Sequence, residues 1–158
     1  MPIKCQNMKN DNNMRNGYQM YKELFESAVQ TNPYIKIASP AKPESIAKAE
    51  ERLKCRFPED LTAFLTEIDG DGDLYFSADR IVTENQSNRT NLAECYPDLD
   101  QYLFIAGNGC GDYYGYRLSN GHVSNYEIVL WEHEDNSARI VANSLVSLIK
   151  LMYIDQVL

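Results

Sequence analysis

A glycine-rich stretch, residues 107–116, constrains the fold of this chain more than any other segment. It holds four glycines within nine positions, and glycine adopts backbone conformations that other residues avoid. An apolar run at 102–106 precedes it, and residues 113–118 lead to a second turn at Asn120-Gly121. This pattern predicts an antiparallel hairpin followed by a second tight turn.

The same stretch does not fit a phosphate-binding loop. A dinucleotide loop places a third glycine three residues after its second and then opens a helix. That position is Asp112 here, whose carboxylate would repel phosphate, and the residues that follow are strand-like. The Gly-Lys-Ser/Thr sequence of a Walker loop does not follow either. We therefore predict no nucleotide site at this turn.

Chain length and composition indicate one soluble globular domain. The 158 residues are 44% apolar and 24% charged, which are ordinary proportions for such a domain. No apolar run approaches the roughly 20 residues that a membrane helix needs, and the first residues lack the apolar core of a signal peptide. We expect a cytoplasmic protein with residues 1–16 as a flexible arm and residues 17–158 as a single domain.

The charge is distributed unevenly along the chain. Residues 1–58 carry ten Lys/Arg and six Asp/Glu (+4), residues 59–135 carry three and sixteen (−13), and residues 136–158 carry two and one (+1), which gives the net −8. An acidic middle of this size repels nucleic acid, which binds through Lys and Arg, and attracts a basic protein partner. A solvated surface that only aids solubility is the alternative.

The acidic turn Asp69-Gly-Asp-Gly-Asp73 resembles the start of a calcium-binding loop. An EF-hand loop needs acidic ligands at positions one, three and five, glycine at six and glutamate at twelve. The first three match, but position six is Leu74 and position twelve is Arg80. We interpret the segment as an acidic turn between a helix and a strand, and predict no metal site.

The periodicity of apolar residues predicts helices on both sides of a group of strands. Residues 79–82 favour a short turn and residues 83–91 an exposed polar loop. Without βαβ alternation, this order predicts an α+β fold, a single domain with a mainly antiparallel sheet and N-terminal and C-terminal helices packed against it. We expect helices at 17–31, 43–53, 58–68 and 144–152, and strands at 34–38, 74–76, 102–106, 113–118 and 126–133.

The candidate catalytic side chains are not spaced as a nucleophile and base. His133 lies among Glu132, Glu134 and Asp135, whose carboxylates favour the charged imidazole. The acidic surroundings disfavour a thiolate at Cys110. The cysteines are scattered without a CxxC pair, which argues against a zinc or redox site: Cys5, Cys55, Cys95 and Cys110. We predict no catalytic residue and no cofactor, and keep a hydrolase using His133 and a neighbouring carboxylate as the less favoured alternative.

Three blocks of the sequence, taken together and in order, resemble the SUKH superfamily. The first runs over 39–65, two helices joined by a short linker with a proline opening the second, and leads to the Asp-Gly turn at 69–70. The second is Gly109-Cys-Gly-Asp-Tyr-Tyr-Gly-Tyr116, and the third is Val129-Leu-Trp-Glu-His-Glu-Asp135. The resemblance covers about residues 39–158 and implies an α+β fold without known enzymatic activity.

The resemblance also implies a function. Bacterial members resemble immunity proteins encoded beside toxins, many of them nucleases, and eukaryotic relatives resemble scaffolds in cell-wall regulation. Because nuclease active sites are basic, the acidic middle favours an immunity protein that occludes the basic active surface of a toxin; a regulatory scaffold in cell-wall or signalling control is the alternative. Trp131 suits either core packing or anchoring at the contact. The expected partner-binding residues are Asp69, Asp71, Asp73, Asp112, Tyr113, Tyr114, Trp131, Glu132, His133, Glu134 and Asp135.

Overall fold

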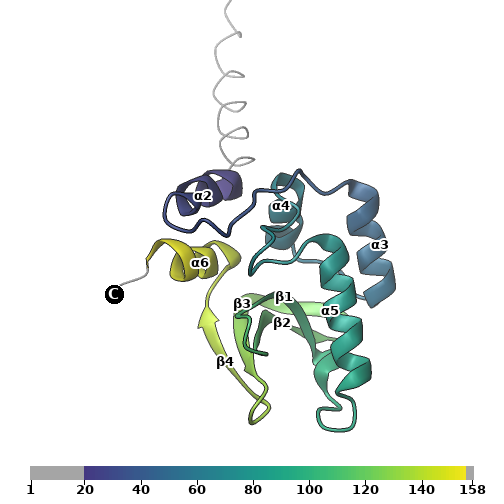
Figure 1. Cartoon of the computed structure of the whole chain (residues 1–158). Coiled ribbons are helices and arrows are strands. Elements are labelled where there is room, and N and C mark those ends of the chain that lie inside the picture. Colours follow the sequence, from purple (N-terminus) through teal and green to yellow (C-terminus); the bar gives the residue numbers. More distant parts are fainter. Residues whose placement is uncertain (1–19, 156–158) are drawn as a thin grey trace, which may run out of the picture.

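The fold is built on a four-stranded antiparallel sheet (Figure 1). The computed structural model describes residues 20–155, so the arm expected at residues 1–16 lies outside the described part. Each strand pairs with the next one along the chain: β1 (Tyr102–Gly107), β2 (Tyr113–Ser119), β3 (His122–Glu132) and β4 (Ser137–Ala142).

Helices precede and follow the sheet and pack against it (Figure 1). Before and beside it lie α2 (Met20–Val29), α3 (Pro43–Leu53), α4 (Glu59–Glu67) and α5 (Ala78–Asn91), then the short η1 (Leu99–Gln101). After β4 come α6 (Leu145–Ile149) and η2 (Lys150–Ile154). The predicted α+β fold is confirmed. Over residues 20–155, no helix is both long and apolar enough to cross a membrane.

The sheet has a hydrophobic core on each face, because alternate strand residues point in opposite directions. Leu103 and Ile105 of β1 belong to the main core with the helices. Their neighbours Tyr102 and Phe104 belong to a second cluster on the other face. The segment that follows α5 supplies Leu92, Tyr96 and Leu99 to this second cluster. Both faces of the sheet are therefore buried along β1 and the second half of β3, whereas the first half of β3 and the middle of β4 have exposed side chains.

The glycine-rich hairpin predicted from the sequence is confirmed. Gly107 of β1 is paired with Tyr113 of β2, across a turn in which Gly109 and Gly111 have φ values of +78° and +98°. Residues other than glycine rarely adopt such φ values. A Cβ atom on Gly115 would lie 2.2 Å from the Leu103 carbonyl oxygen, so glycine is also required for the close approach of β1 and β2.

Residues 79–91, expected as a turn and a loop, instead lie in helix α5. Ser77 caps the helix by accepting from the Arg80 N–H at 3.1 Å. Further along, Asn85 acts as a strand partner for β1: its Nδ2 donates to the Phe104 carbonyl at 2.8 Å, and its Oδ1 accepts from the Phe104 N–H at 2.9 Å. The loop prediction was wrong because the apolar residues of the buried face end at Val82, and the inward positions that follow are polar: Asn85, Asn88 and Arg89.

Three strand predictions also differ from the structure. Residues 74–76, predicted as a strand, contribute an isolated bridge between Tyr75 and Ala106. Residues 34–38, predicted as an edge strand, have no strand partner, and the Lys36 N–H instead donates to the Asp71 carbonyl at 2.7 Å. β4 was not predicted. It follows the turn at 133–136 and pairs with β3.

Candidate functional site

Two turns lie side by side at one end of the sheet. Tyr113 is paired with Gly107 on one side and with Trp131 on the other. This register places the glycine turn, residues 108–112, next to the β3–β4 turn, residues 133–136. Residues far apart in sequence, from the second and third resemblance blocks, therefore form one surface.

Asp112 joins the two turns through His133. Its Oδ1 accepts from the His133 backbone N–H at 3.0 Å and lies 2.7 Å from Nδ1 of the imidazole. Its Oδ2 accepts from Asn108 Nδ2 at 3.0 Å. The hydrogen bond from the His133 imidazole, followed in size by the one from the His133 main-chain N–H, holds the pKa of Asp112 below its usual value. This carboxylate fixes one turn against the other.

Asn108 shapes the glycine turn from within, a role that the sequence analysis missed. Its Oδ1 accepts from the backbone N–H groups of Cys110 at 2.8 Å and Asp112 at 3.3 Å. Asparagine side chains commonly bond to the backbone two residues ahead in this way. The Asn-Gly pair at 108–109 was the available signal.

An acidic depression of about 320 Å³ lies between the two turns. The side chains of Glu132 and Asp135 bond to Ser137, and the bond to Ser137 lowers the pKa of Asp135. His133 is half-exposed, with 44% of its side chain accessible. No Lys or Arg is among the described residues that line the depression, which are Cys110, Asp112, Glu132, His133, Glu134 and Asp135.

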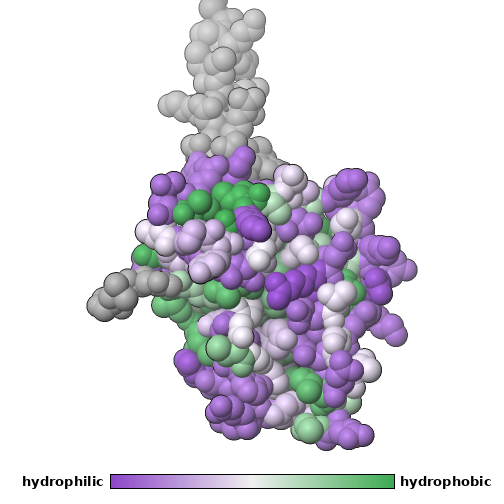
Figure 2. Space-filling view, viewed as in Figure 1, coloured by the Kyte–Doolittle hydropathy of each residue, from purple (hydrophilic) through white to green (hydrophobic). Residues whose placement is uncertain are grey.

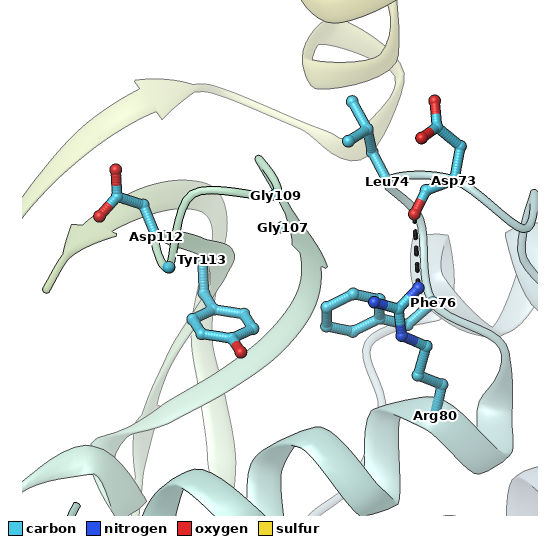
Figure 3. A pocket seen from close by; sticks show the side chains of 9 residues that line it. Asp73, Leu74, Phe76, Arg80, Gly107, Gly109, Asp112 and Tyr113 are labelled. Atoms are coloured by element: carbon cyan, nitrogen blue, oxygen red, sulfur yellow. Dashed lines mark hydrogen bonds between the residues drawn. The ribbon is translucent and has the colours of Figure 1, made fainter. Parts of the chain in front are cut away.

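A second hollow of about 240 Å³, which we call the aromatic slot, lies beside the glycine turn (Figure 3). The rings of Phe76 and Tyr113 meet edge to face with centroids 6.1 Å apart. The Arg80 guanidinium lies over the Phe76 ring at 4.4 Å and bonds to the Asp73 carbonyl at 3.3 Å and to Glu84 at 3.2 Å. The Tyr113 hydroxyl donates to the other Glu84 oxygen at 3.0 Å.

Asp71, expected at the contact surface, is fully buried. Its carboxylate accepts from the N–H groups of Asp73 and Tyr75 and from the Tyr153 hydroxyl. Burial raises the pKa of Asp71. Asp69 also points to an internal partner, accepting from the N–H of Ala78 at 2.8 Å. The expectation for Asp71 was wrong because the backbone turn folds this carboxylate inward, which the run of acidic residues does not reveal.

Trp131 is likewise buried and packs against other aromatic rings. It contacts Phe104 and Tyr96 with ring centroids 5.7 and 5.2 Å apart, and its Nε1 donates to Asn136 Oδ1 at 2.7 Å. Of the two roles considered for it, the structure assigns core packing. Tyr114 is half-buried opposite Leu130.

Cys110, His133 and Asp112 lie around the same depression. These are residue types that a cysteine hydrolase uses as nucleophile, base and orienting acid. Among the hydrogen bonds of residues 20–155, none joins the Cys110 thiol to the His133 ring, whose Nδ1 faces Asp112. The same residues contain no cluster of three His, Cys, Asp or Glu side chains suited to a metal ion.

Comparison with known proteins gives one family match. The family described as SMI1 / KNR4 family (SUKH-1) matches residues 40–150. This range includes α3, α4, α5, the whole sheet and the start of the C-terminal helices. A search of curated proteins gives no match to the chain.

Proposed function

The chain belongs to the SMI1 / KNR4 family (SUKH-1), and on this basis we propose that it is a non-enzymatic protein-binding domain. Its proposed role is that of an immunity protein, which neutralises a cognate bacterial toxin by covering the toxin's basic active surface. Immunity proteins occur in this family. The proposed partner is a nuclease domain, because nucleases present cations to bind phosphates.

The acidic depression is the observation that carries the proposal. Its four carboxylates come from two turns and are Asp112, Glu132, Glu134 and Asp135. A concentrated negative field of this kind accelerates encounter with a basic surface and orients the partner. Because Glu134 and Asp135 at its rim are exposed, we expect these charges to act mainly on association rate and specificity.

The hydrogen bonds beneath the depression suit it to recognition. Asp112 is tied to His133 and Asn108, and Asp135 is tied to the Ser137 N–H at 3.0 Å. Glu132 is also bonded to the Ser137 hydroxyl, so three of the four carboxylates are held in place before a partner arrives. A surface that is already ordered loses less conformational entropy on binding.

A protection assay tests this proposal. The chain is co-expressed with the toxin domain encoded beside its gene, and cell survival is compared between two charge-matched triple variants. Glu132→Gln, Glu134→Gln and Asp135→Asn remove carboxylates around the depression while retaining hydrogen-bonding atoms. The control triple, Glu44→Gln, Glu51→Gln and Glu59→Gln, removes exposed carboxylates on and at the start of α3 and α4.

We expect the control triple to protect cells as the natural chain does. The triple variant of the depression should bind the toxin about threefold to about hundredfold more weakly, because it removes three carboxylates and an exposed ion pair contributes about 0.2–1 kcal/mol. Affinity should also fall as NaCl rises from about 50 to about 300 mM. Equal loss in both triples would indicate a general charge effect. Absence of protection by the natural chain would contradict the toxin assignment itself.

A further inference from the structure

We infer that two copies of this chain associate by pairing their β4 strands edge to edge, which joins the two sheets into one antiparallel sheet. The two edges of the sheet differ in the described structure. Other parts of the chain cover the outer edge of β1, whereas the outer edge of β4 is open. An open edge presents unpaired N–H and C=O groups that can pair with another chain. This inference does not depend on the proposed function.

The outer edge of β1 is covered along its length. Asn85 bonds to both the N–H and the carbonyl of Phe104. Arg89 Nη2 donates to the Tyr102 carbonyl at 2.9 Å. Residues 74–76 supply further main-chain hydrogen bonds to the end of the strand. No second chain can pair with this edge unless α5 moves away.

β4 has no such cover. Among the hydrogen bonds of residues 20–155, only one reaches its main chain from outside the sheet: Asp135 accepts from the Ser137 N–H at 3.0 Å, at the first residue of the strand. The strand contains no proline and no lysine, the residues that commonly protect natural edges from pairing. A register shift opposite Ile128 and Val129 increases its twist locally, but it gives the outer main-chain groups no partner.

A second copy fits this edge in both pattern and charge. Two identical strands pair antiparallel about a two-fold axis, so both copies use the same surface. An axis beside Ile140, whose side chain is 56% exposed, places the two isoleucines opposite each other and Arg139 opposite Val141 of the other copy. This register keeps the two guanidinium groups from facing each other, and like charges directly opposite are destabilising. The acidic turns, residues 133–136, then lie roughly 30 Å apart at opposite ends of the joined strands, beyond the screening length of about 8 Å.

Exposed apolar side chains accompany the open edge. β4, α6 and the end of the described chain lie along one side of the molecule (Figure 1), and Figure 2 shows hydrophobic side chains between α6 and the end of β4. Within residues 20–155, three of the seven exposed large hydrophobic side chains belong to β4 and η2: Ile140, Leu151 and Ile154. A stable dimer buries side-chain surface as well as main-chain groups, and this side of the molecule can supply both.

Sedimentation equilibrium of the whole chain, from about 5 to about 500 µM, tests the inference because self-association depends on concentration. We expect the mass to rise from that of one chain to that of two. Ile140→Lys replaces the central apolar pair by two ammonium groups and should weaken association at least about tenfold. The control is Ile37→Lys, which changes another exposed isoleucine in a segment outside the sheet and should leave association unchanged.

Hydrogen exchange of the natural chain gives a second measurement that needs no variant. We expect the β4 amides to exchange more slowly at high than at low chain concentration, because pairing satisfies their N–H groups. A single-chain mass at every concentration, equal weakening by the two variants, or association without slower exchange in β4 would overturn the pairing. The survival assay described above tests the proposed function separately.

Discussion

Replacing Asp71 by alanine should destabilise the fold, because this buried carboxylate satisfies three hydrogen-bond donors. Its Oδ1 accepts from the N–H groups of Asp73 and Tyr75 at 2.9 Å each, and its Oδ2 accepts from the Tyr153 hydroxyl at 2.5 Å. The last bond connects the acidic turn to η2, 82 residues further along the chain. Alanine would leave these donors without their acceptor.

The expected loss follows from the two donors in fully buried bonds, the Tyr75 N–H and the Tyr153 hydroxyl. A buried donor without an acceptor costs about 1–3 kcal/mol, so Asp71→Ala should lower the free energy of unfolding by about 2–6 kcal/mol. Domains of this kind are stable by about 5–15 kcal/mol. Asp71→Asn keeps one oxygen for the two N–H groups and places an amide NH₂ against the hydroxyl, which can accept. Burial also raises the pKa of Asp71, so its ionised form is penalised, and the neutral amide should lose only about 1–2 kcal/mol.

Urea unfolding at neutral pH, followed by circular dichroism, measures these differences. Asp98→Ala is the control, because Asp98 is exposed and its side chain caps no helix; we expect it to stay within about 0.5 kcal/mol of the natural chain. Adding Tyr153→Phe in a double-mutant cycle isolates the bond between the two side chains. A loss below about 0.5 kcal/mol for Asp71→Ala, or equal losses for alanine and asparagine, would refute the reasoning.

Two further predictions concern the other buried or bonded polar groups. The pKa of Asp112 is lowered in the fold, so its contribution to stability is present above its ordinary value of 3.8 and is lost as pH falls through the lower folded value. Asp112→Asn should reduce the fall in urea midpoint on acidification from about pH 5 to about pH 2, and an unchanged profile would contradict its bonds to His133. Asn85→Ala should cost about 2–6 kcal/mol by leaving the Phe104 N–H and carbonyl unpaired. Asn91→Ala, at an exposed position of the same helix, is its control in urea unfolding, and an equal cost in the two variants would show that Asn85 is no substitute for a strand partner.

The turns of the sheet could be predicted from the sequence where the backbone conformation requires a particular type of residue. Glycine at 109 and 111, required by positive φ values, marked the first hairpin, and Asn120-Gly121 marked the next turn. Helices with a continuous apolar stripe, such as α3 and α4, were equally accessible. In each case a local pattern is sufficient to predict the element. The strands of a hairpin are adjacent in sequence, and an amphipathic helix needs only a hydrophobic core to pack against.

Helix α5 and Asp71 show where local patterns fail. The inward residue Asn85 replaces a missing strand at the edge of β1, a role that exists only once the sheet is present. Asp71 is one of three aspartates in five residues, yet it alone is fully buried, since its acceptors are matched by donors from the turn and from Tyr153. Composition gives the charge of a segment, whereas the hydrogen-bond partners, which come from distant elements, determine which carboxylates reach the surface.

The same distinction identifies what makes the proposed contact surface specific. Asp112 and Glu134 are equally acidic in sequence, but Asp112 has three internal hydrogen bonds and Glu134 is exposed. Asp112 therefore contributes by fixing the relative position of two turns, and Glu134 contributes charge to the rim. Electrostatic attraction to a basic partner depends on the sum of such charges, while discrimination between partners depends on their spacing. In the proposed function, the hydrogen bond between Asp112 and His133 sets that spacing, so it links the stability of the fold to the choice of partner.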